Sequence, residues 1–296
     1  MNFGNTSELN VPKKIINKII GQTRAVDIIN KASKQRRHVL LIGSPGTGKS
    51  MLGKALSELL PKSALEDVLV LSNHKDQNMP LVRTMISGRG SEILSMARQN
   101  SAKNLKKQSI FFLIFSILAL MFPWWIRLIY GDIMAAASMV SGVMFLVLYG
   151  IAINMNSRRK QNNEPKLLID NKLKISSPYV DATGAHAGAL LGDVRHDPFQ
   201  SGGLGTPAHL RVEPGMIHRA NKGVLFIDEI ATLDLPTQQE LLTAMQEKKS
   251  SITGKSDKSA GAMVRTQPVP CDFILVAAGN LDTIERMHPA LRSRIR

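Results

Sequence analysis

The residues with the clearest chemistry lie between Gly43 and Ser50. The stretch reads Gly43-Ser44-Pro45-Gly46-Thr47-Gly48-Lys49-Ser50 and matches G-x-x-x-x-G-K-[ST] at every fixed position. In such a loop, glycines allow consecutive backbone N–H groups to turn inward and hold phosphate oxygens. We expect the Lys49 ammonium to reach the β- and γ-phosphates and the Ser50 hydroxyl to bind Mg²⁺. All eight residues are therefore predicted to bind a nucleotide, and a chance glycine-rich turn is the alternative.

Two carboxylates end a second apolar run, Gly223–Ile227, and form the next candidate group. Asp228 would hold Mg²⁺ directly or through water. Glu229 would lie beside the γ-phosphate and orient or activate the attacking water. A lone apolar run that ends in Asp-Glu is a weak signal. It becomes a strong one when the same chain carries a phosphate loop.

Two further polar groups follow near the end of the chain. Asn280 comes directly after the apolar run Phe273–Ala278 and Gly279, where its amide could hold the water that attacks the phosphate. The alternative is an ordinary turn residue. The segment His288–Arg294 carries a cluster of arginines, whose alternative interpretation is a solvated helix end.

Strands and helices alternate around these groups, which indicates an α/β fold with a central parallel sheet and helices on both faces. The strand before the phosphate loop is predicted at His38–Ile42, and a helix should follow the loop as far as about Leu60 and Pro61. The other predicted elements are helices in Val11–Arg37 (broken at Gly21-Gln22), Ser91–Asn100 and Thr237–Lys248, a strand at Asp67–Ser72, and a long irregular region over Tyr179–Arg219.

Two long uncharged runs interrupt this pattern. Residues 110–126 and 133–153 contain no charged side chain. At a rise of about 1.5 Å per residue they extend roughly 25 and 32 Å, against a hydrocarbon core of about 30 Å. The six residues between them permit only an antiparallel hairpin. Because neither run has the polar face of a soluble helix, we expect two membrane spans rather than a buried soluble helix pair.

The charges beside the runs predict the orientation of the hairpin. The short link carries only Arg127, which Asp132 offsets. By the positive-inside rule, both ends of the hairpin, both termini and the rest of the chain should be cytoplasmic, with the link outside the cell membrane. The flanking cations would also gain about 1 kcal/mol each near anionic lipid. These cations are Lys103, Lys106, Lys107, Arg158, Arg159 and Lys160.

Composition narrows the alternatives further. The chain of 296 residues has a formal net charge of +15 and one cysteine, Cys271, so an internal disulfide is excluded. Its seven histidines lack metal-ligand spacing, and we expect no structural zinc. Met1–Glu8 is polar, which argues against a secretory signal. The cations lack interleaved aromatic residues, so a nucleic-acid partner is disfavoured.

The order of the motifs resembles that of AAA+ ATPases. Ile20-Gly21-Gln22, Gly43–Ser50, Leu225–Glu229, Asn280 and Ala290–Arg294 are similar to the box II, Walker A, Walker B, sensor 1 and arginine-finger elements. More closely, nearly all of the chain resembles the ATPase region of archaeal, membrane-anchored Lon proteases. The most specific features are the hairpin between the two Walker motifs and the stretches Gly184–Arg219 and Gly254–Asn280.

This resemblance implies a homo-hexameric ring that uses ATP and Mg²⁺ to unfold proteins and deliver them to a protease domain. It implies that Ile20 helps to bind the nucleotide and that Arg294, or else Arg292, reaches the neighbouring subunit's ATP. Its substrates would be unfolded or misfolded proteins, membrane proteins among them. The loops Phe199–Thr206 and Gly254–Ala262 would touch substrate in the pore, with Phe199 and Leu204 as the apolar contacts.

We predict three segments: residues 1–105 and 161–296 as two parts of the ATPase domain, and residues 106–160 as the hairpin. The lid with sensor 2 and the Ser–Lys protease domain of such a family are absent, so we expect the chain to be a fragment. The alternative function is a membrane-tethered AAA+ remodeller or helicase-like ATPase without protease activity. A transporter is disfavoured because the spans carry no charge, and a G-protein because N-K-x-D is missing.

Overall fold

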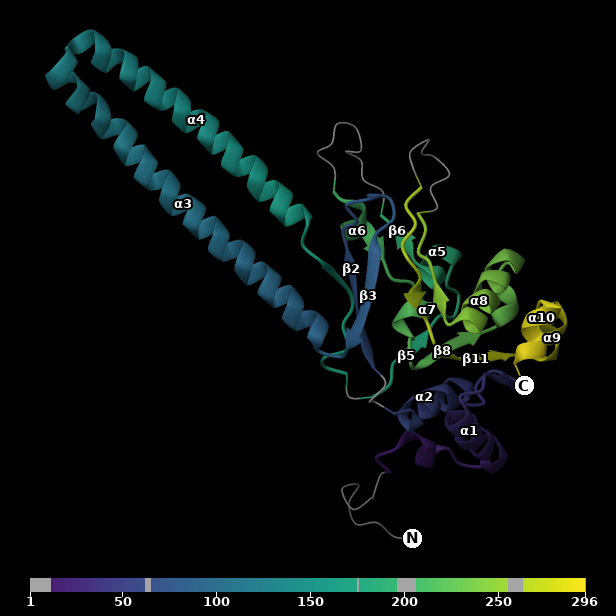
Figure 1. Ribbon diagram of the computed structural model, residues 1–296. Coiled ribbons are helices and arrows are strands. Elements are labelled where there is room, and N and C mark those ends of the chain that lie inside the picture. The colour runs from purple at the N-terminus through teal and green to yellow at the C-terminus, as the bar shows by residue number, and fades with distance from the viewer. Residues whose placement is uncertain (1–11, 62–64, 175, 196–205, 255–262, 296) are drawn as a thin grey trace. The chain divides into compact units, whose positions relative to one another are not determined.

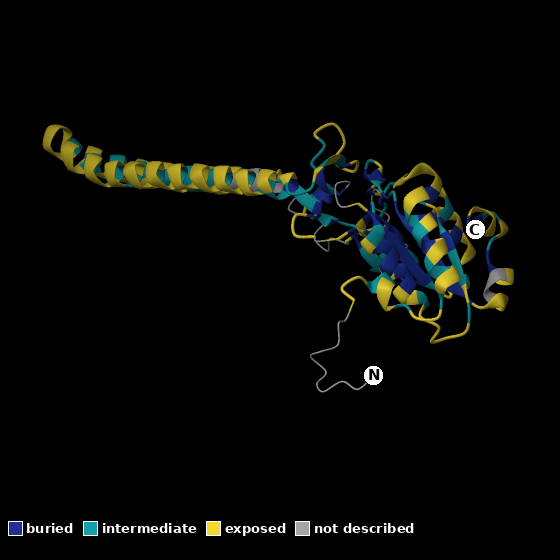
Figure 2. Ribbon diagram, turned by 90° about the horizontal axis from the view of Figure 1, so that it is seen from below, coloured by how far each residue is buried: buried dark blue, intermediate teal, exposed yellow. Residues whose placement is uncertain are grey.

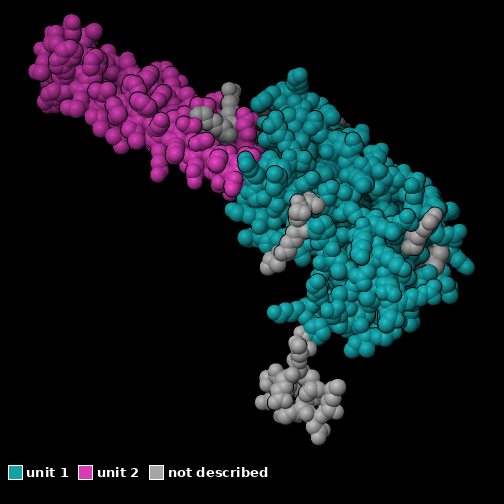
Figure 3. Space-filling model, turned by 60° about the horizontal axis from the view of Figure 1, so that its bottom comes forward, with its two compact units in different colours: residues 1–91, 167–296 teal, residues 92–166 magenta. Residues whose placement is uncertain are grey.

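The computed structural model describes residues 12–61, 65–174, 176–195, 206–254 and 263–295. The chain forms two compact units, which Figure 3 distinguishes by colour. The first, here called the α/β unit, contains residues 1–91 and 167–296. The second, the hairpin unit, contains residues 92–166.

A parallel four-stranded sheet forms the centre of the α/β unit, in the order β1-β11-β8-β5. This confirms the predicted α/β fold with a parallel sheet. The register aligns Ile42 with Gly279 and Asp228 with Ala278, so the carboxyl ends of the three neighbouring strands β1, β11 and β8 meet at one edge. The strands are β1 (Val39–Ile42), β5 (Tyr179–Asp181), β8 (Val224–Asp228) and β11 (Ile274–Gly279).

Helices cover both faces of this sheet, as Figure 1 shows and as the burial in Figure 2 reflects. Strand side chains alternate between the faces. Phe226 of β8 packs with the helices α1 (Thr23–Gln35) and α2 (Lys49–Leu59), whereas Leu225 packs with α8 (Leu235–Glu247) on the other face. Because β8 and β11 are covered on both faces, their sequences are nearly continuous apolar runs.

A second sheet has the order β3-β2-β4, and β2 and β3 are antiparallel. The predicted strand at Asp67–Ser72 is therefore present, and it belongs to this separate sheet. Its strands are β2 (Glu66–Leu71), β3 (Leu81–Ile86) and β4 (Lys166–Ile169). Two short antiparallel pairs complete the unit: β6 (Asp193–Val194) with β7 (Val212–Glu213), and β9 (Lys249–Ser250) with β10 (Val269–Pro270).

The prediction of one long irregular region over Tyr179–Arg219 was wrong, because short elements occupy most of its described part. Besides β5, β6 and β7, these are α5 (Ala187–Leu191), α6 (Ala208–Arg211) and α7 (Met216–Arg219). Their apolar side chains, such as Leu190 and Ile217, are buried in the core beside the central sheet. The remaining helices are η2 (Ile15–Lys18), η4 (Ile230–Thr232), α9 (Leu281–Arg286) and α10 (Pro289–Arg294).

The hairpin is made of α3 (Arg89–Tyr130) and α4 (Asp132–Asn162). The prediction that Ser91–Asn100 forms a separate short helix was wrong: α3 is continuous over 42 residues, since no glycine or proline interrupts it between Ser91 and Phe122. Only Gly131, at φ 85°, links the two helices. An ion pair of 2.7 Å between Arg127 Nε and Asp132 Oδ1 closes the turn.

Small and aromatic side chains hold the two helices together. A Cβ atom added to Gly142 of α4 would lie 3.5 Å from the carbonyl oxygen of Ala119 in α3. The two helices are thus in ordinary van der Waals contact at this position, next to a carbonyl that Pro123 cannot bond in the usual i to i−4 pattern. Phe115 packs edge-on against Tyr149 with ring centroids 5.8 Å apart. Among the described residues, both helices are long and apolar enough to cross a membrane, judged by length and composition.

Candidate functional site

The phosphate loop occupies the turn between β1 and α2. Gly46 and Gly48 have φ values of 82° and 79°, in the left-handed region that favours glycine. The Thr47 hydroxyl donates to the Ser44 carbonyl at 2.9 Å, and Lys49 Nζ donates to the Gly43 carbonyl at 2.8 Å. Local hydrogen bonds therefore shape the loop and direct the lysine ammonium back over it.

The loop lines a cavity of about 460 Å³ that also includes Asp228. The structure thus brings together the end of β8 and the start of α2, as expected from parallel strands that end at one edge. Ser50 and Asp228 offer the hard oxygen ligands that Mg²⁺ prefers, and Lys49 with the α2 N-terminus offers positive potential for phosphate. This donor set fits a Mg²⁺–nucleoside triphosphate. The lining residues are Pro45, Gly46, Thr47, Gly48, Lys49, Ser50, Met51, Lys54 and Asp228.

The two carboxylates at the end of β8 have different surroundings. Asp228 is half-buried, and its Oδ1 accepts a hydrogen bond of 3.0 Å from the backbone N–H of Glu229. Glu229 is exposed and adopts the left-handed conformation, with φ 50° and ψ 53°. The chain therefore turns sharply at the residue predicted to activate water.

Asn280 lies beside the start of the phosphate loop. The Gly43 N–H donates to the carbonyl of Gly279 at 3.1 Å, which joins β11 to the loop one residue before Asn280. Asn280 itself is exposed at the end of the strand. Asn280, the predicted sensor residue, is thus adjacent to the loop in space although far from it in sequence.

Arg292 and Arg294 lie on α10, and both side chains are exposed. His288 caps this helix by accepting the Ala290 N–H at 3.3 Å. Among the described residues, the cavity lining includes neither arginine, nor Glu229 or Asn280. An exposed arginine outside the cavity is compatible with action on a neighbouring subunit.

Ile20 is 92% exposed, and the described cavity lining does not include it, Gly43 or Ser44. The neighbouring Gln22 instead reaches the loop, with Nε2 donating to the Thr47 carbonyl at 2.6 Å. The predicted loop contacts Phe199 and Leu204 lie outside the described residues, as does most of Gly254–Ala262.

Sequence reasoning missed Lys54. This residue lies one helical turn after Ser50, and the i, i+4 spacing could have indicated that both share a face of α2. Its Nζ lies 5.7 Å from the ring centroid of Tyr179 in β5. Burial, then the charges of Asp181 and Asp228, raise the pKa of Tyr179, so its hydroxyl stays neutral. The cavity therefore contains a second lysine held over a neutral aromatic ring.

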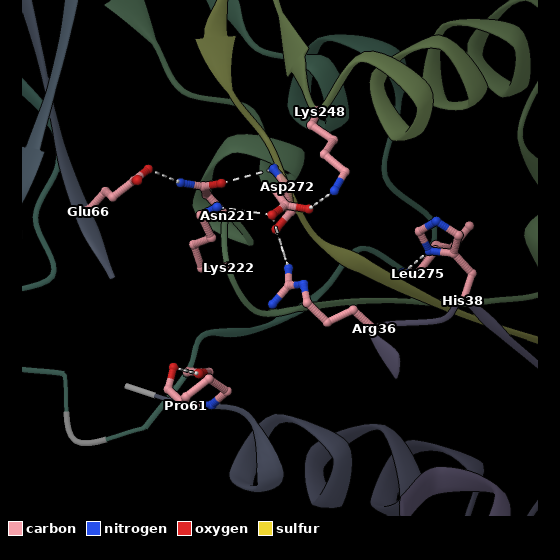
Figure 4. A network of polar contacts seen from close by, with 10 residues as sticks. Arg36, His38, Pro61, Glu66, Asn221, Lys222, Lys248, Asp272 and Leu275 are labelled. Atoms are coloured by element: carbon pink, nitrogen blue, oxygen red, sulfur yellow. Dashed lines mark hydrogen bonds and ion pairs between the residues drawn. The ribbon is translucent and has the colours of Figure 1, made fainter. Parts of the chain in front are cut away.

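The opposite edge of the sheet carries a dense polar network, shown in Figure 4. Asp272, two residues before β11, binds three cations through its carboxylate. These are Lys222 at 3.0 Å, Arg36 at 3.3 Å and Lys248 at 3.5 Å. Asn221 accepts the Asp272 N–H at 2.9 Å, and its amide extends the network to Glu66. These groups lie at the amino ends of the strands, away from the phosphate loop.

Comparisons with known proteins agree with this arrangement. Two family models match, "Magnesium chelatase, subunit ChlI" over residues 15–87 and "Sigma-54 interaction domain" over residues 202–289. The archaeal Lon protease of Thermococcus kodakarensis is 58% identical over 100% of this chain and 46% of its own length. The proteins of that name from Archaeoglobus fulgidus and Methanothermobacter thermautotrophicus are 55% and 52% identical, again over 100% of this chain and over 46% and 44% of theirs.

The chain thus spans slightly less than half the length of the curated relatives that it matches. Each alignment includes the whole chain, and with it the phosphate loop, the hairpin and the two carboxylates. From its parallel sheet, its phosphate loop and these relatives, we conclude that the chain is similar, over its whole length, to a part of the archaeal Lon proteases.

Proposed function

We propose that the α/β unit binds and hydrolyses ATP with Mg²⁺. Lys49 and the loop backbone would hold the β- and γ-phosphates, while Ser50 and Asp228 would bind Mg²⁺. Glu229 would orient the attacking water and Asn280 would help to hold it. The observation that carries the proposal is the cavity in which the phosphate loop meets Asp228. Bound Mg²⁺ would supply charge stabilisation to the transferred phosphoryl group.

We further propose that hydrolysis drives the unfolding and translocation of protein substrates for a membrane-anchored, ATP-dependent serine protease of which this chain is the ATPase part. Support comes from the relatives named archaeal Lon protease. The subunits would form a homo-hexamer in which Arg294 reaches the ATP of a neighbour. An arginine supplied in this way contributes about 10³–10⁵-fold to the rate in related enzymes.

The hairpin unit would anchor this ATPase in the cell membrane with both chain ends cytoplasmic. The support is the length and composition of α3 and α4 together with the cations that flank the apolar runs. Protease protection tests the orientation. A site introduced next to Gly131 should be cut from outside the cell and protected from inside; the reverse pattern would contradict the proposal.

The proposed activity is tested with the full-length protein, purified in detergent, as the wild type and as Glu229→Gln. The wild type should hydrolyse ATP, and an unfolded protein should stimulate it. Glu229→Gln should bind ATP with similar affinity and lose at least about 99% of turnover, because the amide cannot activate water. Turnover near the wild-type rate in this variant would remove Glu229 from the proposed role.

A second candidate is a membrane-tethered AAA+ remodeller or helicase-like ATPase without protease activity. It is favoured by the family models that match, since their descriptions name a chelatase and a sigma-54 interaction domain and no protease. Stimulation of ATP hydrolysis by DNA, without stimulation by unfolded protein, would support this candidate and contradict the first.

A further inference from the structure

We propose that Thr183 is a positioning residue of the ATPase site, because its hydroxyl fixes the backbone that carries Asp228 and Glu229. The inference rests on the proposed ATP hydrolysis at these two carboxylates. Thr183 itself lies outside the phosphate-loop cavity as described. It acts on the reaction through the end of β8.

The pairing of β5 with β8 places Thr183 beside the end of β8. These parallel strands align Tyr179 with Val224 and Asp181 with Phe226. The ladder ends where the Ala182 N–H donates to the Phe226 carbonyl at 2.8 Å. The last backbone N–H of β8, that of Asp228, donates to Thr183 Oγ1 at 3.0 Å. A side-chain hydroxyl thus continues the backbone ladder to the first catalytic carboxylate.

Two hydrogen bonds to Asp181 orient Thr183 and its hydroxyl. Thr183 Oγ1 donates to Asp181 Oδ1 at 2.7 Å, and the Thr183 N–H donates to the same oxygen at 3.1 Å. An ionised carboxylate can only accept. The hydroxyl proton is therefore directed to Asp181, which leaves an oxygen lone pair free to accept from Asp228. Charge-assisted hydrogen bonds of this kind are about twice as strong as neutral ones.

A strained turn follows Asp228. Glu229 has φ 50° and ψ 53°, a conformation that costs a non-glycine residue about 1–2 kcal/mol. Directly afterwards, the Thr232 N–H donates to the Glu229 carbonyl at 2.8 Å and begins η4. A strained turn of this type persists when its surroundings restrain it. The bond from Thr183 restrains the residue immediately before the turn.

The consequence concerns catalysis more than stability. Asp228 is half-buried and Glu229 is exposed, so in a variant without the Thr183 hydroxyl, water can take its place as the acceptor for the Asp228 N–H. Water does not restore the position of the backbone. A displacement of about 1 Å at reacting groups costs about 10²-fold in rate. Loss of the Thr183 hydroxyl should therefore disturb Mg²⁺ binding at Asp228 and water activation at Glu229 more than it disturbs folding.

The matched variants are Thr183→Val, which keeps the shape and removes the hydroxyl, and Thr183→Ser, which keeps the hydroxyl. In the full-length protein we expect Thr183→Val to lower kcat for ATP about 10- to 100-fold. The Mg²⁺ concentration for half-maximal turnover should rise several-fold. Binding of a non-hydrolysable ATP analogue measured at saturating Mg²⁺ should change less than about twofold, because the phosphate loop supplies most nucleotide contacts. Thr183→Ser should restore kcat to within about threefold.

Wild-type kcat and Mg²⁺ dependence in Thr183→Val would overturn the inference. An equal loss in Thr183→Ser would also overturn it, because that variant retains the hydroxyl. Asp181→Ala provides a second test, and it changes an exposed side chain. By releasing the hydroxyl proton it should lower kcat about three- to tenfold, and an unchanged kcat would refute the assigned orientation. Asp228→Asn in the same assay separates the two proposals: if it keeps wild-type turnover, the proposed function itself fails.

Discussion

Replacing Asp272 with asparagine should lower the local stability of the central sheet at the amino end of β11. The side chain of Asp272 is 18% exposed and receives Lys222, Arg36 and Lys248 (Figure 4). These three cations have φ values of 60°, 51° and 57°, so all are in the left-handed region. Arg36 and Lys248 end α1 and α8. The ion pairs of one carboxylate therefore connect the strained ends of α1 and α8 and the α7–β8 turn to the residues just before β11.

The size of the effect follows from burial. A hydrogen bond to a charged group contributes about 1.5–3 kcal/mol, and the bond with Lys222 is the shortest and most buried of the three. Lys248 is 64% exposed, and such a pair contributes about 0–1 kcal/mol. Asparagine also leaves the two better-buried cations without a counter-charge. Asp272→Asn should therefore cost about 2–4 kcal/mol in the free energy of opening β11.

The effect should depend on pH. Burial acts to raise the pKa of Asp272, but the hydrogen bond from Lys222 and the charges of Arg36, Lys222 and Lys248 together outweigh it and lower the pKa below its usual value. A group with a lowered folded pKa stabilises the fold above its unfolded pKa of about 3.9. Its contribution disappears as the pH falls through the folded pKa. The difference between wild type and Asp272→Asn should therefore be constant near neutrality and shrink below about pH 4.

Native-state hydrogen exchange of the β11 amides in the full-length protein is the assay, because global unfolding of a chain with more than one compact unit is often not two-state. Arg195→Gln is the matched control. Arg195 is 74% exposed and pairs with Glu213 at 3.2 Å, so its loss should change protection by less than about 0.5 kcal/mol. If Asp272→Asn changes β11 protection no more than this control does, the reasoning is refuted.

Three further outcomes are expected. Asp67→Ala should lower the local stability of the segments just before and after the hairpin by about 3 kcal/mol. The fully buried Asp67 carboxylate accepts three backbone N–H groups, those of Gly88, Gly90 and Asn171. Unchanged hydrogen exchange of these three amides would contradict this prediction. Gly215→Ala should greatly reduce the yield of folded protein, because the new Cβ would overlap backbone atoms of Gly192 and Leu190, and normal yield would count against this packing. Arg294→Ala should lower ATP turnover by about 10³-fold or more without loss of ATP binding, and Arg292→Ala should do so less; equal effects would leave the finger unassigned to either residue.

Much of the candidate site could be predicted from the sequence because its motifs are local. The spacing of Gly43–Ser50 dictates a strand, a turn with left-handed glycines and a helix start, and the structure contains all three. That Asp228 would meet this loop also followed, since parallel strands bring their carboxyl ends to one edge. The length of α3 was misjudged because an uncharged run locates an apolar stretch but does not locate the end of a helix that continues past it.

Other parts of the site depend on contacts that no local pattern encodes. Lys54 enters the cavity because α2 packs across β5 and β8, and Thr183 reaches Asp228 only because β5 pairs with β8 in one particular register. No motif in the sequence points to Asp272, yet three separate segments converge on it.

The sequence by itself therefore determined the phosphate loop, the paired carboxylates, the α/β class and the two apolar helices, because each depends on residue type and spacing over a few turns of chain. Tertiary structure decided which side chains restrain those groups. Hydrogen bonds and ion pairs between distant segments depend on strand register and helix packing, and those depend on the burial of the whole core at once.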